Sequence, residues 1–295
     1  LEPDAGPRAS HVNHTQDKPV DSFCLCLNIF LDLSEVVSNR TVRAKKMASA
    51  EKPSSEAEHG TEPDDEDPVF ATVFPPSSKL DAYGMAFDDM AVFENAGHSR
   101  EHIGMLATYG FVNFRGMRTL LMGIAARLRP RRGGEGEKEQ QLPLAQALSG
   151  ARFLDLGSGD GRAVIGAAVL VPTLAEAAGV ELSVSRNDLA LRNRARLPEH
   201  LRAVVRFEQC DIMHVEPARI GATEIVWLAN LRFPDETVEA INTWLEENCA
   251  VEVDAVIATL RECHFSRPHT QWTEQVSMSW NPAGWPVFCY HLPAR

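Results

Sequence analysis

The chain of 295 residues has a formal net charge of −12, and 44% of its residues are hydrophobic. That is enough for a sizeable core, so the composition is globular overall. The acidity argues against a uniformly basic coat for nucleic acid, and no apolar run approaches the roughly 20 residues that span a bilayer.

We expect residues 1–68 to be an acidic segment that is disordered or a leader. Residues 48–68 are rich in Glu, Asp, Ser and Pro and contain no aromatic side chain, which is typical of disorder. The apolar run Phe23–Leu33 has the length of a signal peptide, but Asp17 and Asp21 precede it where basic residues belong. With Met47 as the start, we expect residues 1–46 to lie upstream of the functional reading frame or to form a dispensable leader; the alternative is that they belong to the functional protein.

Residues 69–150 predict a small helical part in front of the main domain. Residues 69–114 mix short apolar stretches with Gly and Pro and show no period. Apolar residues then recur on one helical face between Met117 and Leu128. The Arg-Pro-Arg-Arg-Gly-Gly run at 129–134 ends that helix, and a short helix is expected over Leu144–Leu148.

Strands and helices alternate in residues 151–295. The expected strands are Phe153–Leu156, Gly179–Leu182, Val204–Glu208, Glu224–Leu228 and Asp254–Leu260, and the helices are Ala163–Val171, Asp188–Arg196 and Asp235–Glu247. Val276–Trp280 and Val287–His291 follow as a hairpin around a turn at 281–284. The alternation predicts an α/β fold with a mostly parallel, seven-stranded sheet that ends in an antiparallel hairpin.

A glycine-rich loop follows the first strand, in Phe153-Leu-Asp-Leu-Gly-Ser-Gly-Asp-Gly161. Glycines there let the backbone turn tightly and approach a ligand just before a helix begins. Glu181 ends the next strand, so it and Asp155 should lie beside the same crevice, where an acid can accept hydrogen bonds from ribose hydroxyls. The alternative is a plain turn without a ligand.

The loop and its acids also indicate which cofactor fits. A dinucleotide fingerprint has the spacing G-x-G-x-x-G, whereas Gly157, Gly159 and Gly161 give G-x-G-x-G. Asp155 and Asp160 would repel a phosphate but suit the ammonium and sulfonium of S-adenosylmethionine. The pattern resembles that of class I methyltransferases.

The resemblance to class I enzymes extends to the end of the third strand. There, an acid typically receives the adenine amine and the next residue packs on the ring. These positions hold Asp211 and Ile212. Asp211 can instead be a helix N-cap or a turn residue.

Three blocks resemble the non-SET histone-lysine methyltransferases of the disruptor-of-telomeric-silencing family. They are the glycine loop with Gly179–Glu181, the loop Asn230-Leu-Arg-Phe233, and the hairpin with Val276–Trp280, Gly284–Val287 and Tyr290. Tyr109–Phe114 is a weaker match. The run after the fourth strand lacks the Asn/Asp-Pro-Pro-aromatic signature of adenine-N6 enzymes, and the chain has no Pro-Cys dipeptide for cytosine-C5 chemistry.

The chain departs from that family at several positions. Phe111 replaces a Glu, Ile212 an aromatic residue, Arg162 a polar residue that is usually Gln, and Cys289 the first of two tyrosines. The short, divergent form looks most like the trypanosomatid members. The resemblance implies that Tyr109 and Arg162 also contact the cofactor.

The resemblance further implies a lysine channel formed by Asn230, Phe233, Trp280 and Tyr290. An aromatic, apolar channel favours the neutral amine that methyl transfer requires. Three of these residues have another interpretation: Phe233 and Trp280 as core packing, and Asn230 as a cap of the following helix. No metal is needed, and no Cys or His residues have zinc spacing.

The expected activity is methyl transfer to a lysine of a nucleosomal core histone of the H-three type, which implies a nuclear chromatin regulator. Arg127, Arg129, Arg131 and Arg132 form a local basic cluster that could contact nucleosomal DNA phosphates, or merely a solvated loop. The alternatives are a class I methyltransferase for RNA or a non-histone protein, and an inactive binding module with the same fold.

Overall fold

The computed structural model describes residues 67–75, 89–99, 102–103, 110–128 and 142–295. All of them belong to one unit, Thr61–Arg295. The predicted leader and nearly all of the predicted disordered segment lie outside the described residues. Asp67, near the expected boundary, caps helix α2 (Pro68–Val73), because its side chain accepts a hydrogen bond from Val69 N.

A seven-stranded sheet forms the centre, with the strand order β3-β2-β1-β4-β5-β7-β6. β1 to β5 are parallel, and β7 runs antiparallel between β5 and β6. The strands are β1 Arg152–Leu156, β2 Glu176–Glu181, β3 Val205–Gln209, β4 Ile225–Leu228, β5 Ala255–Thr259, β6 Thr270–Val276 and β7 Trp285–Leu292. The fold class expected from the sequence is confirmed.

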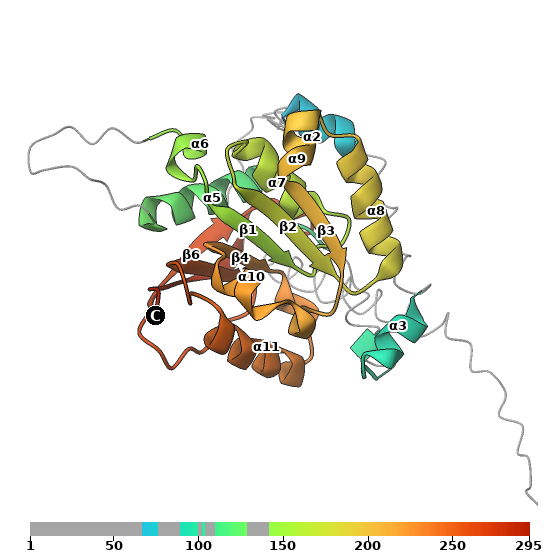
Figure 1. Ribbon diagram of the computed structural model, residues 1–295, viewed down its shortest axis with the longest axis vertical. Coiled ribbons are helices and arrows are strands. Elements are labelled where there is room, and N and C mark those ends of the chain that lie inside the picture. The colour runs from blue at the N-terminus through green and yellow to red at the C-terminus, as the bar shows by residue number, and fades with distance from the viewer. Residues whose placement is uncertain (1–66, 76–88, 100–101, 104–109, 129–141) are drawn as a thin grey trace, which may run out of the picture. The chain divides into compact units, whose positions relative to one another are not determined.

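Helices cover both faces of this sheet (Figure 1). One face packs against α2, α5 (Phe114–Leu128), α7 (Arg162–Leu170) and α9 (Glu199–Val204), and the other against α10 (Pro217–Gly221) and α11 (Asp235–Asn248). Since successive strand residues point to opposite faces, Phe153 lies in one core and Leu154 in the other. Burial on both faces explains why β4 and β5 are continuous apolar runs.

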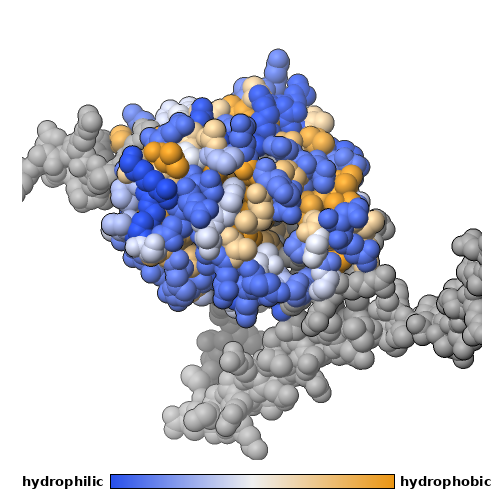
Figure 2. Space-filling view, turned by 60° about the horizontal axis from the view of Figure 1, so that its bottom comes forward, coloured by the Kyte–Doolittle hydropathy of each residue, from blue (hydrophilic) through white to orange (hydrophobic). Residues whose placement is uncertain are grey.

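Further helices lie at the edges of the sheet. α8 (Val184–Ala195) runs along β3, while α3 (Met90–Asn95), α6 (Leu144–Ala147) and the 3-10 turns η3 (Ile212–His214) and η4 (Asn230–Arg232) complete the described elements. No described helix is long and apolar enough to cross a membrane. On the face that Figure 2 shows, hydrophobic residues form small patches between hydrophilic ones.

The prediction of the first hairpin strand is wrong. It covers Thr270–Val276 rather than Val276–Trp280. β6 is an edge strand whose Thr-Gln-Trp-Thr-Glu-Gln-Val sequence alternates between exposed and half-buried residues, so it lacks a strong apolar signal.

The short helices α9 and α10 were not predicted, because a helix of one or two turns leaves little periodicity. α8 begins four residues before the expected start, because Ser183 accepts a hydrogen bond from Arg186 N and caps it.

Candidate cofactor site

The glycine-rich loop connects β1 to α7 at the carboxyl edge of the sheet. Gly157, Gly159 and Gly161 have φ angles of +88°, +54° and +85°, a backbone region that residues other than glycine rarely adopt. Gly157 N and Ser158 N donate hydrogen bonds of 2.8 and 2.9 Å to Val180 O in β2. The loop is therefore tied to the neighbouring strand.

The three loop glycines have different neighbours. A Cβ atom on Gly161 would lie 2.4 Å from Cζ of Phe207, so this glycine allows close packing against β3. Gly157 and Gly159 line a pocket with a cavity volume of about 330 Å³, and Gly161 does not. The predicted cofactor loop is thus present, but Gly161 has a packing role.

Glu181 lines the same pocket with a largely buried carboxylate. Its Oε2 atom accepts a hydrogen bond of 2.8 Å from Gly159 N, and its Oε1 atom accepts one of 2.9 Å from Ser183 N. The carboxylate therefore connects the glycine loop to the end of β2. Its place in the pocket wall leaves it available to hydroxyl groups of a ligand.

Asp211 and Ile212 also line the pocket, from the end of β3. Oδ1 of Asp211 accepts a hydrogen bond of 2.9 Å from Met213 N, so Asp211 caps η3 while facing the cavity. Both interpretations of Asp211 are therefore compatible. His98 lies across the pocket, where burial lowers its pKa and the charge of Asp211 partly opposes that shift.

Asp155, which was predicted to contact the cofactor, lies in β1 with only 2% of its surface exposed and is not among the residues that line the pocket. Its Oδ1 atom is buried and has no hydrogen-bond partner among the described residues. Burial raises the pKa of this carboxyl well above its usual range, and the charges of Glu181 and Asp160 act in the same direction. A cation bound nearby would stabilise the ionised form.

An N-terminal segment supplies a further wall of the pocket. Asp89 accepts hydrogen bonds from Ser183 Oγ (2.6 Å) and Ser185 N (2.9 Å) at the start of α8. This contact anchors α3, which contributes Phe93 to the pocket, followed by Ala96 and His98. These residues could not be predicted from the sequence, because residues 69–114 show no hydrophobic period. Arg186 also lines the pocket and was not predicted.

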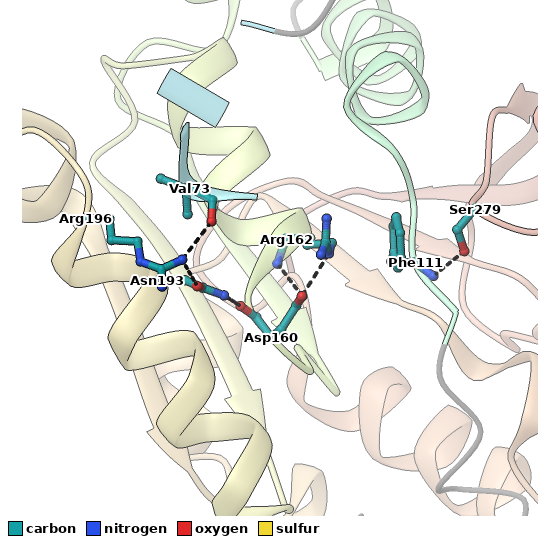
Figure 3. Close-up of polar contacts among 7 residues, drawn as sticks. All are labelled: Val73, Phe111, Asp160, Arg162, Asn193, Arg196 and Ser279. Carbon is teal, nitrogen blue, oxygen red and sulfur yellow. Dashed lines mark hydrogen bonds and ion pairs between the residues drawn. The ribbon is translucent and has the colours of Figure 1, made fainter. Parts of the chain in front are cut away.

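Arg162 lies outside the pocket, contrary to the expected cofactor contact. Its Nε atom is 2.8 Å from Oδ2 of Asp160, and its guanidinium stacks on Phe74 (4.4 Å) and Phe111 (4.3 Å). Asp160 O accepts a hydrogen bond from Asn193 Nδ2 (3.0 Å), as Figure 3 shows. Arg162 thus stabilises the glycine-rich loop through Asp160 and does not line the pocket.

Two of the four predicted channel residues lie in the loop after β4. Phe233 lines the pocket, and its Cζ atom would be 3.8 Å from a Cβ atom on Gly157. Asn230 is fully buried and does not line the pocket; its Oδ1 atom accepts hydrogen bonds from Leu260 N (3.1 Å) and Arg261 N (2.9 Å). Asn230 therefore fixes this loop to the end of β5.

The predicted position of Tyr290 in the channel is wrong. Tyr290 pairs with Ile257 in the middle of β5, is fully buried and does not line the pocket. Its hydroxyl oxygen accepts a hydrogen bond of 2.8 Å from Cys263 N, and its ring packs on Phe265. Burial raises the pKa of the phenol. Tyr290 is a core residue.

Trp280 does not line the pocket itself but lies at its rim, where its ring is next to Gly110, and 40% of its surface is exposed. A Cβ atom on Gly110, which lines the pocket, would come within 2.5 Å of its ring. Residues 110–113 run beside the turn of the hairpin: Phe111 N donates to Ser279 Oγ (3.1 Å, Figure 3), and Asn113 Nδ2 donates to Ser277 Oγ (2.7 Å). Tyr109 lies outside the described residues.

Only Arg127 of the predicted basic cluster falls within the described residues; Arg129, Arg131 and Arg132 lie outside them. Nη1 of Arg127 is 3.7 Å from Oε1 of Glu274, and the guanidinium stacks on Trp272. Its charge is therefore already partly balanced. The described part of the chain contains no group of three His, Cys, Asp or Glu residues that could hold a metal ion.

The strand order, with β7 antiparallel between β5 and β6 and a glycine loop after β1, defines the fold of class I S-adenosylmethionine-dependent methyltransferases. No protein-family model matches the chain, and no curated protein matches its sequence.

Many solved structures resemble the chain in part. An RNA methyltransferase from Salinibacter ruber, in complex with S-adenosyl-L-homocysteine, is 19% identical over 54% of this chain and 95% of that one, with a TM-score of 0.39. A candidate O-methyltransferase from Klebsiella pneumoniae is 13% identical over 78% and 91%, with a TM-score of 0.42. Because these values are low, the fold assignment depends on the topology.

Proposed function

We propose that the protein binds S-adenosylmethionine in this pocket and is a methyltransferase. The observation that carries the proposal is that Gly157, Gly159, Glu181 and Asp211, from the ends of three neighbouring strands, line one cavity. The sequence pattern predicted the same four residues as cofactor contacts.

The residues present fit each part of this cofactor. The carboxylate of Glu181 suits ribose hydroxyls, and that of Asp211 suits an exocyclic amine. Ile212 and Ile241 offer an apolar surface to the adenine ring. The buried, unpartnered Oδ1 of Asp155 suits a cationic ligand, which would offset the cost of its ionisation.

When bound, the cofactor supplies an electrophilic methyl group on a sulfonium ion. The protein has to hold the acceptor in line with it and exclude water. Phe233 and the half-exposed Trp280 provide apolar surface at the pocket and its rim. An apolar wall lowers the pKa of an approaching amine, because burial disfavours its charged form. Phe233 and Trp280 would thus keep the lone pair of an acceptor amine available for methylation.

We further propose that the acceptor is a lysine of a nucleosomal histone, which implies a nuclear role in chromatin regulation. Two blocks that resemble the disruptor-of-telomeric-silencing family, 110–113 and 276–280, lie side by side although they are far apart in sequence. Their contact includes Trp280 against Gly110, which lines the pocket, and this supports the choice.

A second candidate is methylation of RNA. The positions of Asn230 and Tyr290 in the core remove two of the four residues of the expected lysine channel, which favours this alternative. Phe233 and Trp280 alone are compatible with an acceptor other than lysine.

Two measurements test these proposals in order. Isothermal titration calorimetry should show binding of S-adenosylmethionine, and its absence would refute the cofactor assignment. Labelled cofactor is then incubated with nucleosomes, free histones or total RNA, with Glu181→Ala as the inactive control. Label on histone supports the first candidate and label on RNA the second. Cofactor binding without transfer to any of the three would indicate an inactive module.

A further inference from the structure

Three arginines lie together where α8, α9 and β3 meet. Arg194 lies in α8, Arg202 in α9 and Arg206 in β3; Arg194 is half-buried and the other two are exposed. We call this group the arginine surface. It lies where β3 begins, whereas the cofactor pocket lies where the parallel strands end.

Two of these guanidinium groups are held side by side by the same carbonyl oxygens. Nε of Arg194 donates to Val205 O (2.8 Å), and its Nη2 donates to Arg202 O (2.9 Å). Nη1 of Arg206 donates to the same two oxygens, at 2.9 and 3.4 Å. Backbone carbonyls orient the guanidinium groups but do not neutralise their charge.

None of the three arginines takes part in an ion pair within the part of the chain that the structure describes. Asp188 and Glu199 are the only acids between 184 and 206. The nearby Glu208 in β3 is bonded to Arg219 at 2.7 Å. Burial, followed by the charges of Arg206 and Arg202, lowers the pKa of Arg194.

We propose that the arginine surface binds the phosphodiester backbone of duplex DNA. Clustered guanidinium groups without carboxylate partners match the closely spaced charges of that backbone. Recognition of single-stranded RNA depends on bases stacked on aromatic rings, and residues 184–206 contain no Phe, Tyr or Trp. Because the surface is separate from the pocket, DNA bound there leaves the pocket open. This inference goes beyond the proposed methyl transfer and does not depend on it.

The test compares two double variants of the full chain that change its charge equally. In Arg202→Ala/Arg206→Ala, both side chains are exposed, and the two backbone carbonyls that Arg206 bonds keep their hydrogen bonds from Arg194, so the fold should persist. The matched control is Arg115→Ala/Arg152→Ala, which removes two exposed arginines from α5 and β1. Fluorescence anisotropy with a short labelled DNA duplex gives the affinity at a series of salt concentrations.

The variant at the arginine surface should bind the duplex about tenfold more weakly, and its slope of log affinity against log salt should fall by about 2. The control should bind like the parent protein. Equal losses in both variants, or no loss in the first, would overturn the proposal, as would tighter binding of a single-stranded RNA of the same length. Calorimetry with S-adenosylmethionine on the same samples tests the cofactor site separately.

Discussion

The carboxyl group of Asp155 is buried with an unpartnered oxygen atom, and its pKa is raised by burial and by the neighbouring acids Glu181 and Asp160. Between the unfolded and the folded pKa, the folded protein binds more protons than the unfolded chain. Stability contributed by this group therefore falls as pH rises through that interval. A buried charge without a partner is tolerated where a ligand uses it.

Replacing Asp155 by Asn should therefore stabilise the protein at neutral pH while weakening cofactor binding. We expect a gain on the order of 1 kcal/mol and a flatter decline of stability above about pH 4. Urea denaturation at several pH values measures the first effect, and calorimetry with S-adenosylmethionine the second. A variant with unchanged pH dependence would show that Asp155 is not the group that titrates.

Gly157 combines a left-handed backbone with a place in the pocket wall. Gly157→Ala should cost about 1 kcal/mol of stability through its positive φ and raise the dissociation constant of the cofactor by about tenfold, because the methyl group would enter the space facing Phe233. Gly150 has φ +77° and nothing within 4 Å of an added Cβ atom, so Gly150→Ala is the matched control. Equal affinities in the two variants would contradict a cofactor at Gly157.

At the scale of elements, Asp89 joins α3 to the start of α8. Asp89→Ala should destabilise the protein by about 1–2 kcal/mol and weaken cofactor binding severalfold, because Phe93 and His98 would no longer be held over the pocket. Asp67→Ala, which removes the cap of α2 far from the pocket lining, controls for the loss of a cap. If both variants kept full affinity, α3 would not shape the cofactor site.

The closing hairpin supplies a second contrast. Tyr290→Phe removes the acceptor of the Cys263 amide, so it should cost about 1–3 kcal/mol and leave the methylated products unchanged. Trp280→Ala, at the exposed rim, should leave stability nearly unchanged and reduce turnover. Denaturation curves and mass spectrometry of the products separate the two effects. Altered ratios of the methylated products in Tyr290→Phe would indicate that Tyr290 contacts the methyl acceptor after all.

At the scale of the whole molecule, described residues between 67 and 295 line the pocket and form both cores, and the sequence predicts that residues 1–46 are a dispensable leader. A chain without residues 1–46 should therefore bind S-adenosylmethionine with unchanged affinity and melt at the same temperature as the full chain. Calorimetry and thermal denaturation of both chains provide the comparison. A loss of affinity greater than about tenfold would mean that the segment expected to be a leader contributes to the site.

Much of this architecture could be predicted because it follows from local patterns. The continuous apolar runs of β4 and β5 can be buried only within a covered parallel sheet. The alternation of strands and helices then fixes the parallel order, and the glycines after β1 together with Glu181 and Asp211 locate the pocket at the carboxyl edge. These features are encoded by residues close together in the chain.

Contacts between distant segments could not be predicted. Asp89 joins α8 across about 95 positions, and nothing in the sequence around Asp89 signals that contact. β6 lies closer to the N-terminus than the predicted strand Val276–Trp280. As an edge strand it does not need the regular apolar alternation on which strand prediction depends. Neither position has a periodic local signal.

The sequence by itself determined the sheet, the glycine loop and the acids that face the pocket, because hydrophobic periodicity and the backbone freedom of glycine act over a few residues. Only the tertiary structure decided which polar side chains face the ligand and which support the fold. Arg162 stacks between Phe74 and Phe111, and Tyr290 and Asn230 accept hydrogen bonds from buried backbone amides. The residue type of a polar side chain leaves both outcomes open, since its partners come from strands and loops far away in the chain.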